Sequence, residues 1–246
     1  MTATLHTRRA PPASQSLVGL VLAAMIVAAW VAGHIYGVFF HRWTVAGTVA
    51  APFLMLLQCW LSVGLFIVAH DGMHGSLAPF HPRINRWVGR MCLAIYAGFS
   101  YDLLIGAHFD HHRHSGTALD PDFHADDPEH FWSWYAVFFR RYFGWRPFLT
   151  IAVVVWTYWL LVDANLANIL LLWAVPALAS SLQLFCFGTY LPHRHEEDGF
   201  ADTHNARSND YSWLVSLLTC FHFGYHHEHH LAPHVPWWKL PSARPH

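Results

Sequence analysis

Long apolar runs separated by short polar turns dominate the pattern of hydrophobic and polar positions along the chain. A helix needs about 20 apolar residues to cross a bilayer, and residues 17–40, 45–69 and 169–190 meet that length. Residues 148–162 form a fourth apolar run that is short for a full span, so we expect its helix to begin near Arg146 or to cross a thin region of bilayer. The pattern predicts four transmembrane helices at these positions.

The connections between these runs predict how the helices pair. Residues 41–44 leave room only for a tight turn, so the first two helices should form an antiparallel hairpin, and the turn 163–168 joins the last two into a second hairpin. Residues 91–107 are apolar but short and contain Gly98, Ser100 and Asp102, which favours a re-entrant or interfacial helix pair. We therefore expect an all-α integral membrane protein with one domain over residues 1–246.

Composition supports a bilayer as the solvent of this fold. Charged residues make up 12% of the 246 residues and hydrophobic residues 54%, whereas about 25% of a soluble domain is charged. So few charges cannot cover a water-exposed surface. The net charge of −1 gives no reason to expect nucleic acid as a partner.

Basic residues lie on one side of the predicted spans. Seven arginines fall between residues 71 and 147, others precede the first span or follow the last, and the two outer turns hold only Arg42. Because basic residues accumulate on the cytoplasmic side of a membrane, both termini and the 71–147 region are predicted to be cytoplasmic.

Histidine is the second departure from ordinary composition, with 22 in the chain. Three clusters have the spacings HxxxH, HxxHH and HxxHH. Residues three or four apart share a helix face, so each cluster should present its imidazoles in one direction. The members are His70 and His74, then His108, His111 and His112, then His226, His229 and His230.

The predicted topology brings these clusters to one place. The first lies at the inner end of the second span, the second follows the re-entrant segment, and the third follows a complete hairpin. His193, just past the last span at the same level, is a ninth candidate. All nine should meet at the cytoplasmic membrane face as metal ligands and catalytic residues.

Nine imidazoles are too many for one metal ion but give two ions four or five ligands each. Imidazole suits iron, zinc, copper and nickel. The chemistry expected of two redox metals with neutral ligands is O2 activation at a non-haem di-iron (Fe2+) centre. Because each ligand must be neutral, metal affinity should fall below pH of about 6.5.

Residues beside the clusters could orient the ligands by accepting hydrogen bonds from imidazole N–H groups, or could face water. The candidates are Asp71, Asp110, His222, His227 and Glu228. The turn at Asp120 and Asp122 either shapes a substrate or donor surface or is a plain loop turn. We expect His124 and His130 at the surface or at an interface.

Longer strings around the histidines resemble known enzymes. The three boxes and two hairpins look like the membrane fatty-acid desaturase and hydroxylase superfamily, and the strings resemble the bacterial-type carotenoid 4-ketolases. The strings are HDGMHGS at 70–76, GTYLPHR at 188–194, FHFGYHHEHHL at 221–231 and PWWKLP at 236–241. The resemblance runs from about residue 50 to residue 241.

The resemblance implies a reaction. Such enzymes oxidise ring carbon 4 of β-ionone rings by two successive hydroxylations and loss of water, taking β-carotene to echinenone and canthaxanthin and zeaxanthin toward astaxanthin. The carotenoid would enter from the membrane lipid, here of a bacterial inner membrane. The chain has no Rossmann glycine fingerprint and no cytochrome-type haem motif, so the electrons should come from an external, ferredoxin-like donor.

Two alternatives remain open at this point. A fatty-acyl desaturase or hydroxylase, or a carotenoid hydroxylase, would use the same metal chemistry. A membrane metal-binding or transport protein would also gather ligands, but transporters place them near the bilayer midplane in broken helices, whereas these histidines lie at span ends.

Overall fold

The computed structural model describes residues 14–196 and 199–244, and every regular element within them is a helix. Helices α1 (Ser14–Ile35) and α2 (Val45–His74) form the first hairpin, and a π-helical turn, Tyr36–Phe40, extends α1 toward the connection. The Thr44 hydroxyl accepts a hydrogen bond from the Gly47 amide at 3.1 Å and so caps α2 at its first turn. The predicted first hairpin and all-helical class are confirmed over the described residues.

The second hairpin begins with α6 (Trp145–Trp156), which continues as a π-helical turn to Leu161. The second helix of this hairpin runs through α7 (Leu166–Ile169), α8 (Val175–Phe185) and α9 (Leu191–His193) without a break. The Asn165 side chain caps α7 by accepting from the Ala167 amide at 2.8 Å. Helix α6 starts at Trp145, one residue before Arg146, near the expected place.

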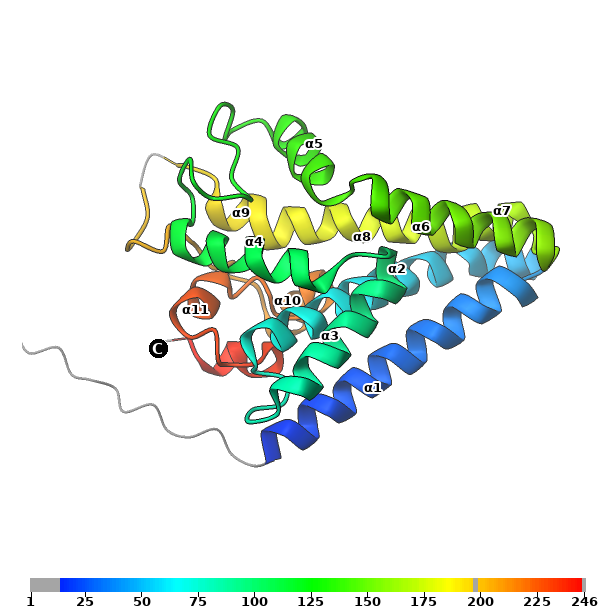
Figure 1. The fold of residues 1–246 in the computed structure, drawn as a ribbon, viewed down its shortest axis with the longest axis horizontal. Coiled ribbons are helices and arrows are strands. Elements are labelled where there is room, and N and C mark those ends of the chain that lie inside the picture. Colours follow the sequence, from blue (N-terminus) through cyan, green and yellow to red (C-terminus); the bar gives the residue numbers. More distant parts are fainter. Residues whose placement is uncertain (1–13, 197–198, 245–246) are drawn as a thin grey trace, which may run out of the picture.

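The outer turns of the two hairpins are tied together by one buried amide. The Trp43 indole donates to Asn168 Oδ1 at 2.7 Å, and Asn168 Nδ2 donates to the carbonyls of Val38 and His41 at 3.3 and 3.0 Å. An amide with both ends bonded can be buried without an unpaired polar group. This contact holds the hairpins side by side at the right-hand end of Figure 1.

Helices α3 (Pro82–Ala97) and α4 (Tyr101–His114) form a pair bent by 102°. Gly98 makes the bend, because it ends α3 with φ of 68°, a conformation that a residue without a Cβ adopts freely. The predicted helix pair is confirmed, although it is longer than residues 91–107. Whether it is re-entrant or interfacial stays a prediction.

The remaining helices lie in the half of the molecule away from the outer turns (Figure 1). They are α5 (Phe131–Tyr142), α10 (Trp213–Cys220), α11 (His226–Leu231) and a 3-10 helix, Trp237–Ser242. The C-terminal ends of α2 and α4 reach the same half. All three histidine clusters therefore lie at one end of the helical hairpins.

Three of the helices are long and apolar enough to cross a membrane: Ser14–Phe40, Val45–His74 and Leu166–His193. Trp145–Leu161 is apolar but shorter, and the bent α3–α4 pair is the other segment of suitable composition. Large apolar side chains such as Leu17, Phe53 and Leu161 stay exposed on these helices, which suits contact with lipid. The chain is an integral membrane protein, while its four-span topology and its orientation remain predictions.

Candidate metal centre

The last turns of α2 and α4 supply the first five imidazoles. Helix α2 runs past the predicted end at residue 69, and its final turn carries His70 and His74 one helical turn apart. Its second half is packed on all sides, with Val63, Leu65 and Ile67 fully buried. A buried helix end holds its side chains in place, so the two rings have a fixed position. Helix α4 presents the remaining three, His108, His111 and His112.

The other four imidazoles come from the C-terminal part of the chain. Helix α11 carries His226, His229 and His230, all buried, and His193 is the last residue of α9. The main chain before α11 turns sharply, since Phe221 and His222 both have positive φ. This turn brings α11 back across the ends of α2 and α4.

The nine side chains form two groups. Potential ligand atoms within each group all lie within 4.8 Å of one another. The first group has members from α2, α4 and α11, and every member of the second group is buried. The first group is His70, His74, His108, His112 and His229; the second group is His111, His193, His226 and His230.

The two groups are direct neighbours. The ring of His112, in the first group, stacks on the ring of His230, in the second, with centroids 4.3 Å apart. The consecutive residues His111 and His112 point into different groups, as do His229 and His230. Two metal ions held here would therefore lie side by side.

The distances between facing nitrogens fit shared metal ions. The Nε2 atoms of His74 and His108 are 2.6 Å apart, and those of His112 and His229 are 3.1 Å apart. In the second group, His226 Nε2 lies 2.9 Å from His193 Nε2 and 3.1 Å from His230 Nε2. Two imidazoles bound at right angles to one ion, each with a bond of about 2.1 Å, would have nitrogens about 3 Å apart.

Unpartnered nitrogens give a second test of the fit. Both ring nitrogens of His70 are buried without a hydrogen-bond partner among the described residues, so either can bind a metal. Buried polar atoms are almost always bonded in native proteins. All-imidazole donors, some of them unpartnered, suit a transition metal such as iron.

Two of the candidate ligands are oriented by hydrogen-bonding groups behind them. His111 Nδ1 donates to both oxygens of Asp120 at 3.0 Å, and that carboxylate also accepts from the amides of Gly116 and Asp122 at 2.8 Å. His193 Nδ1 lies 2.7 Å from the Asn205 carbonyl oxygen. In both rings Nδ1–H is engaged in a hydrogen bond, so Nε2 is the atom that could bind a metal.

Asp71 is the one expected orienting residue that lies beside a ligand. Its Oδ1 atom is 3.7 Å from His70 Nδ1, too long for a hydrogen bond, and its Oδ2 atom accepts from the Trp237 amide at 3.1 Å. The carboxylate therefore anchors the C-terminal 3-10 helix against α2. A role toward His70 stays a prediction.

Asp110 and His227 lie away from the two groups, which for Asp110 is the second of the two alternatives left open by the sequence. Asp110 lies at the surface and pairs with Arg113 at 2.8 Å, while His227 Nε2 pairs with Asp202 at 2.9 Å. Adjacent positions on a helix point about 100° apart, and these two side chains point away from both groups toward their own partners. Neither side chain makes a described contact with the two groups.

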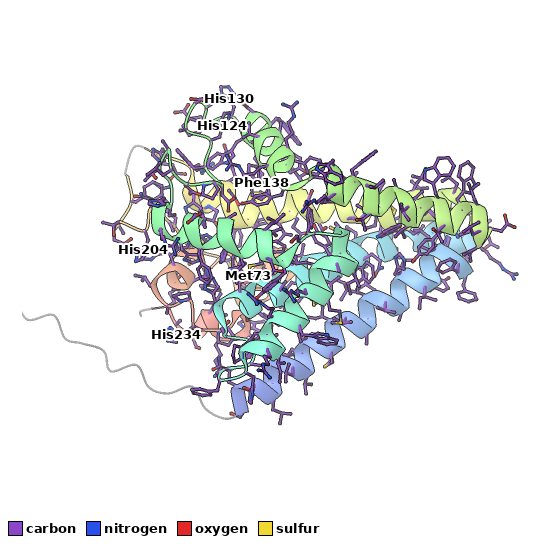
Figure 2. The ribbon with its side chains drawn as sticks, in the orientation of Figure 1. Met73, His124, His130, Phe138, His204 and His234 are labelled. Carbon is purple, nitrogen blue, oxygen red and sulfur yellow. The ribbon has the colours of Figure 1, made fainter. Side chains whose placement is uncertain are left out.

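Glu228 and His222 are also bonded elsewhere. The Glu228 carboxylate accepts from the Ser208 hydroxyl, and His222 Nδ1 lies 3.3 Å from Ser216 Oγ. Both residues are buried, so they stabilise the turn before α11 and the loop beside it rather than orient a ligand. His130 is exposed and His124 is half-buried, and both lie at the edge of the molecule in Figure 2.

Burial sets the protonation of the site. Desolvation, and after it the nearby imidazoles, lowers the pKa of His226, His229 and His230 well below the usual value of 6.5. These rings are therefore neutral at pH 7, as ligands must be. Burial alone would raise the pKa of Asp120, but its bonds with His111 and two amides bring that pKa below its ordinary value.

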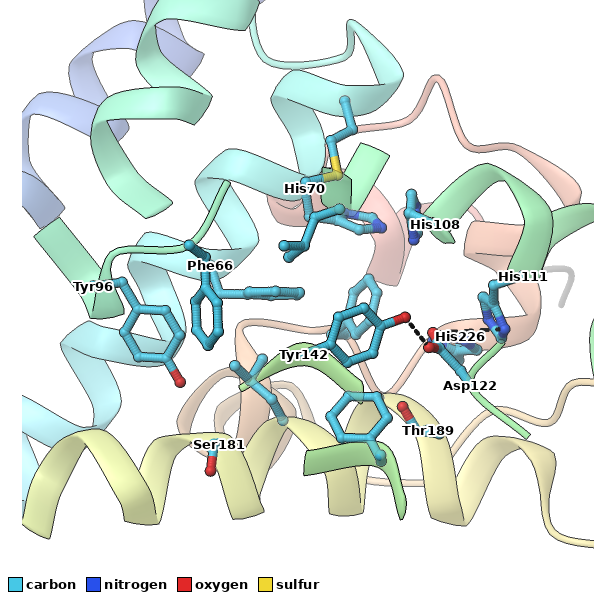
Figure 3. Close-up of a pocket in the computed structure, with 17 residues that line it drawn as sticks. Phe66, His70, Tyr96, His108, His111, Asp122, Tyr142, Ser181, Thr189 and His226 are labelled. Atoms are coloured by element: carbon cyan, nitrogen blue, oxygen red, sulfur yellow. Dashed lines mark hydrogen bonds and ion pairs between the residues drawn. The ribbon is translucent and has the colours of Figure 1, made fainter. Parts of the chain in front are cut away.

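A mostly apolar pocket ends at the two groups (Figure 3). Phenylalanines from α2, α5 and the loops line it. Four candidate ligands close one end: His70 and His108 from the first group, and His111 and His226 from the second. A molecule in this pocket would touch both groups at once.

The fold and site match a known family. The family model described as fatty acid desaturase matches residues 42–149 and 128–246. The chain belongs to this family of membrane oxidoreductases with histidine boxes.

Within the family, the chain is similar to carotenoid ketolases. A beta-carotene ketolase from Paracoccus sp. (strain N81106 / MBIC 01143) is 49% identical over 95% of both chains, and one from Paracoccus sp. (strain PC1) is 48% identical over 96% of both. A zeaxanthin 4-ketolase from Chlamydomonas reinhardtii is 38% identical over 95% of this chain and 54% of its own length. No solved structure matches significantly. The resemblance to bacterial carotenoid ketolases is thus confirmed.

Proposed function

We propose that this protein is a carotenoid ketolase that oxidises ring carbon 4 of β-ionone rings with O2 at a non-haem di-iron centre. The observation that carries the proposal is the pocket that ends at both histidine groups. The names of the similar enzymes supply the substrate class. β-Carotene would give echinenone and canthaxanthin, and zeaxanthin would lead toward astaxanthin.

The two groups are proposed to hold one iron ion each. The nitrogen spacing and the neutral rings support this assignment. When bound, the iron pair would supply the oxidising chemistry, using O2 and electrons from an external donor. Asp120 and the Asn205 carbonyl would keep His111 and His193 in the tautomer that presents Nε2.

The chain's other residues would bind the ring and exclude water. Phe66, Phe99 and Phe223 line the pocket beside the histidines, and they suit a methylated ring and a polyene taken from lipid. The C–H bond at carbon 4 is allylic, and therefore comparatively weak. Shape and apolar contact would thus decide which carbon faces the site.

The overall chemistry balances as two hydroxylations and one dehydration. Each hydroxylation consumes one O2, two electrons and two protons, converts a C–H bond into C–OH, and releases one water. The second gives a carbon with two hydroxyl groups, which loses water to form the ketone. A small ferredoxin-like protein on the cytoplasmic side of a bacterial inner membrane is the donor we propose.

Expression in a β-carotene-producing host tests the proposal. The wild type should yield 4-keto pigments, and His74→Ala should abolish them because it removes a ligand of the first group. His130→Ala is the matched control, since that exposed ring pairs only with Asp127 in the described structure. A wild type that reaches the membrane with iron bound yet leaves carbon 4 unoxidised would overturn the proposal, and a fatty-acyl product would point to a desaturase.

A further inference from the structure

One polar pair interrupts the apolar wall of the pocket next to the histidines. The Tyr142 hydroxyl, from the end of α5, donates to Asp122 Oδ1, and both residues line the pocket. Figure 3 shows the phenol pointing toward Asp122 and His111, at the metal end rather than the far end. A carboxylate in an apolar pocket is costly unless it has a partner or a task.

The pair keeps unused hydrogen-bonding capacity. A carboxylate offers about four acceptor positions and a phenol accepts as well as donates. Asp122 Oδ2 lies 3.9 Å from His111 Nδ1, beyond hydrogen-bonding length, because that N–H is bonded to Asp120 instead. One carboxylate oxygen and the phenol oxygen therefore stay available to a hydroxyl donor in the pocket.

Two other tyrosine hydroxyls near the pocket are already paired, whereas Thr189 also lines the pocket near its histidine end (Figure 3). Tyr96 bonds to Ser180 at 3.0 Å, and Tyr135, on the same helix as Tyr142, bonds to Ser181 at 2.7 Å. Tyr96 and Ser181 lie toward α8, away from His108, His111 and His226 (Figure 3). The Tyr142–Asp122 pair differs from these two pairs because it lies at the histidine end of the pocket and keeps free hydrogen-bonding positions.

β-Carotene has no hydroxyl to offer this pair, but its first oxidation product does. The new hydroxyl on carbon 4 forms where the ring faces the histidines, within the part of the pocket that Asp122 and Tyr142 line. We propose that Tyr142 and Asp122 bind the 4-hydroxyl of the half-oxidised ring and hold it in place for the second oxidation. The inference rests on the proposed ketolase function and makes Tyr142 a positioning residue.

This retention explains how one site can make a ketone rather than an alcohol. After the first hydroxylation, the product either leaves for the bilayer or is oxidised again. A hydrogen bond to the alcohol slows its departure and adds nothing to the binding of the unoxidised ring. Loss of one such bond weakens binding of the alcohol by about fivefold to tenfold.

The test measures the ratio of 4-hydroxy to 4-keto product made from β-carotene by the iron-loaded enzyme. Tyr142→Phe should raise that ratio about fivefold while iron content stays within twofold of wild type. Tyr135→Phe is the matched control: it makes the same change on the same helix and should leave the ratio unchanged. With oxygen excluded, Tyr142→Phe should weaken binding of the 4-hydroxy carotenoid about fivefold and leave β-carotene binding unchanged.

The outcomes separate the inference from the proposed function. An unchanged ratio in Tyr142→Phe, or an equal rise in Tyr135→Phe, overturns the inference while the wild type still makes ketone. If Tyr142→Phe does not accumulate, Asp122→Asn takes its place, with the same rise expected and the same unchanged ratio overturning the inference. A wild type that oxidises no carbon 4 overturns the proposed function itself.

Discussion

Replacing Asp120 with asparagine should release iron from the second group. The carboxylate accepts from His111 Nδ1 on both oxygens at 3.0 Å and from two backbone amides at 2.8 Å. A carboxamide has one accepting oxygen, so its NH2 must face at least one of these donors, and the negative charge behind His111 is lost. A hydrogen bond to a charged group contributes about 1.5–3 kcal/mol, which corresponds to the 10–100-fold loss of metal affinity typical of such partners.

The assay is the iron retained per chain after dialysis of the detergent-solubilised protein against graded concentrations of a ferrous chelator. Asp110→Asn is the matched control: it makes the same change beside His111, but at an exposed residue paired with Arg113. Exposed pairs contribute about 0–1 kcal/mol, so this variant should retain iron like the wild type. The reasoning fails if Asp120→Asn also retains iron at wild-type chelator concentrations.

Three further predictions follow from the same contacts. His193→Ala should lower the iron content from two ions to about one per chain because it opens the second group, whereas His227→Ala, bonded to Asp202, should not; equal iron in both variants would contradict the grouping. The pKa of His226, His229 and His230 is lowered on folding, so below pH 6.5 the unfolded chain takes up protons that the folded chain excludes. The free energy of unfolding of the iron-free protein should therefore fall between pH 7 and pH 5.5 by about 1 kcal/mol per histidine. Its melting temperature should fall with it, and a constant or rising melting temperature would refute this. Gly19→Ala should destabilise the protein by about 1–3 kcal/mol, because a Cβ there would lie 2.1 Å from the Leu77 carbonyl oxygen, while Gly106→Ala, with open space, should have little effect; thermal unfolding of the two variants decides.

The hairpins and the histidine convergence could be predicted because both follow from regular periodicity. Apolar runs of bilayer length predicted the long helices, and spacing of three or four placed several imidazoles on one helix face. His193 was predicted from its level in the topology alone. What periodicity could not show is the division into two groups, since His111 and His112 are neighbours in sequence yet serve different groups.

The residues behind the ligands were harder to predict. Asp120 follows His111 by nine positions through an irregular turn, and its role depends on how that turn folds back on α4. The sequence drew attention to that turn but could not distinguish a site from a plain loop. Asp110 and Glu228 were chosen for adjacency to ligands, although adjacent positions on a helix point about 100° apart. Tyr142 reaches the pocket only through the packing of α5 against α8.

Burial also changes one prediction about pH. The reference imidazole pKa suggested that metal affinity would fall below pH of about 6.5. In the folded protein, desolvation lowers the pKa of the α11 histidines, so protons compete with the metal only at lower pH. Iron should therefore stay bound at pH 6, which retention of iron after dialysis at that pH can check.

The central claim is that nine histidines from four helices hold two iron ions side by side. The most direct measurement is iron content per chain combined with iron-edge X-ray absorption on the purified protein. We predict two iron ions per chain, with imidazole nitrogens dominating the first coordination shell. A single ion per chain, a different metal under iron-replete expression, or a shell dominated by carboxylate oxygen or sulfur would contradict the account.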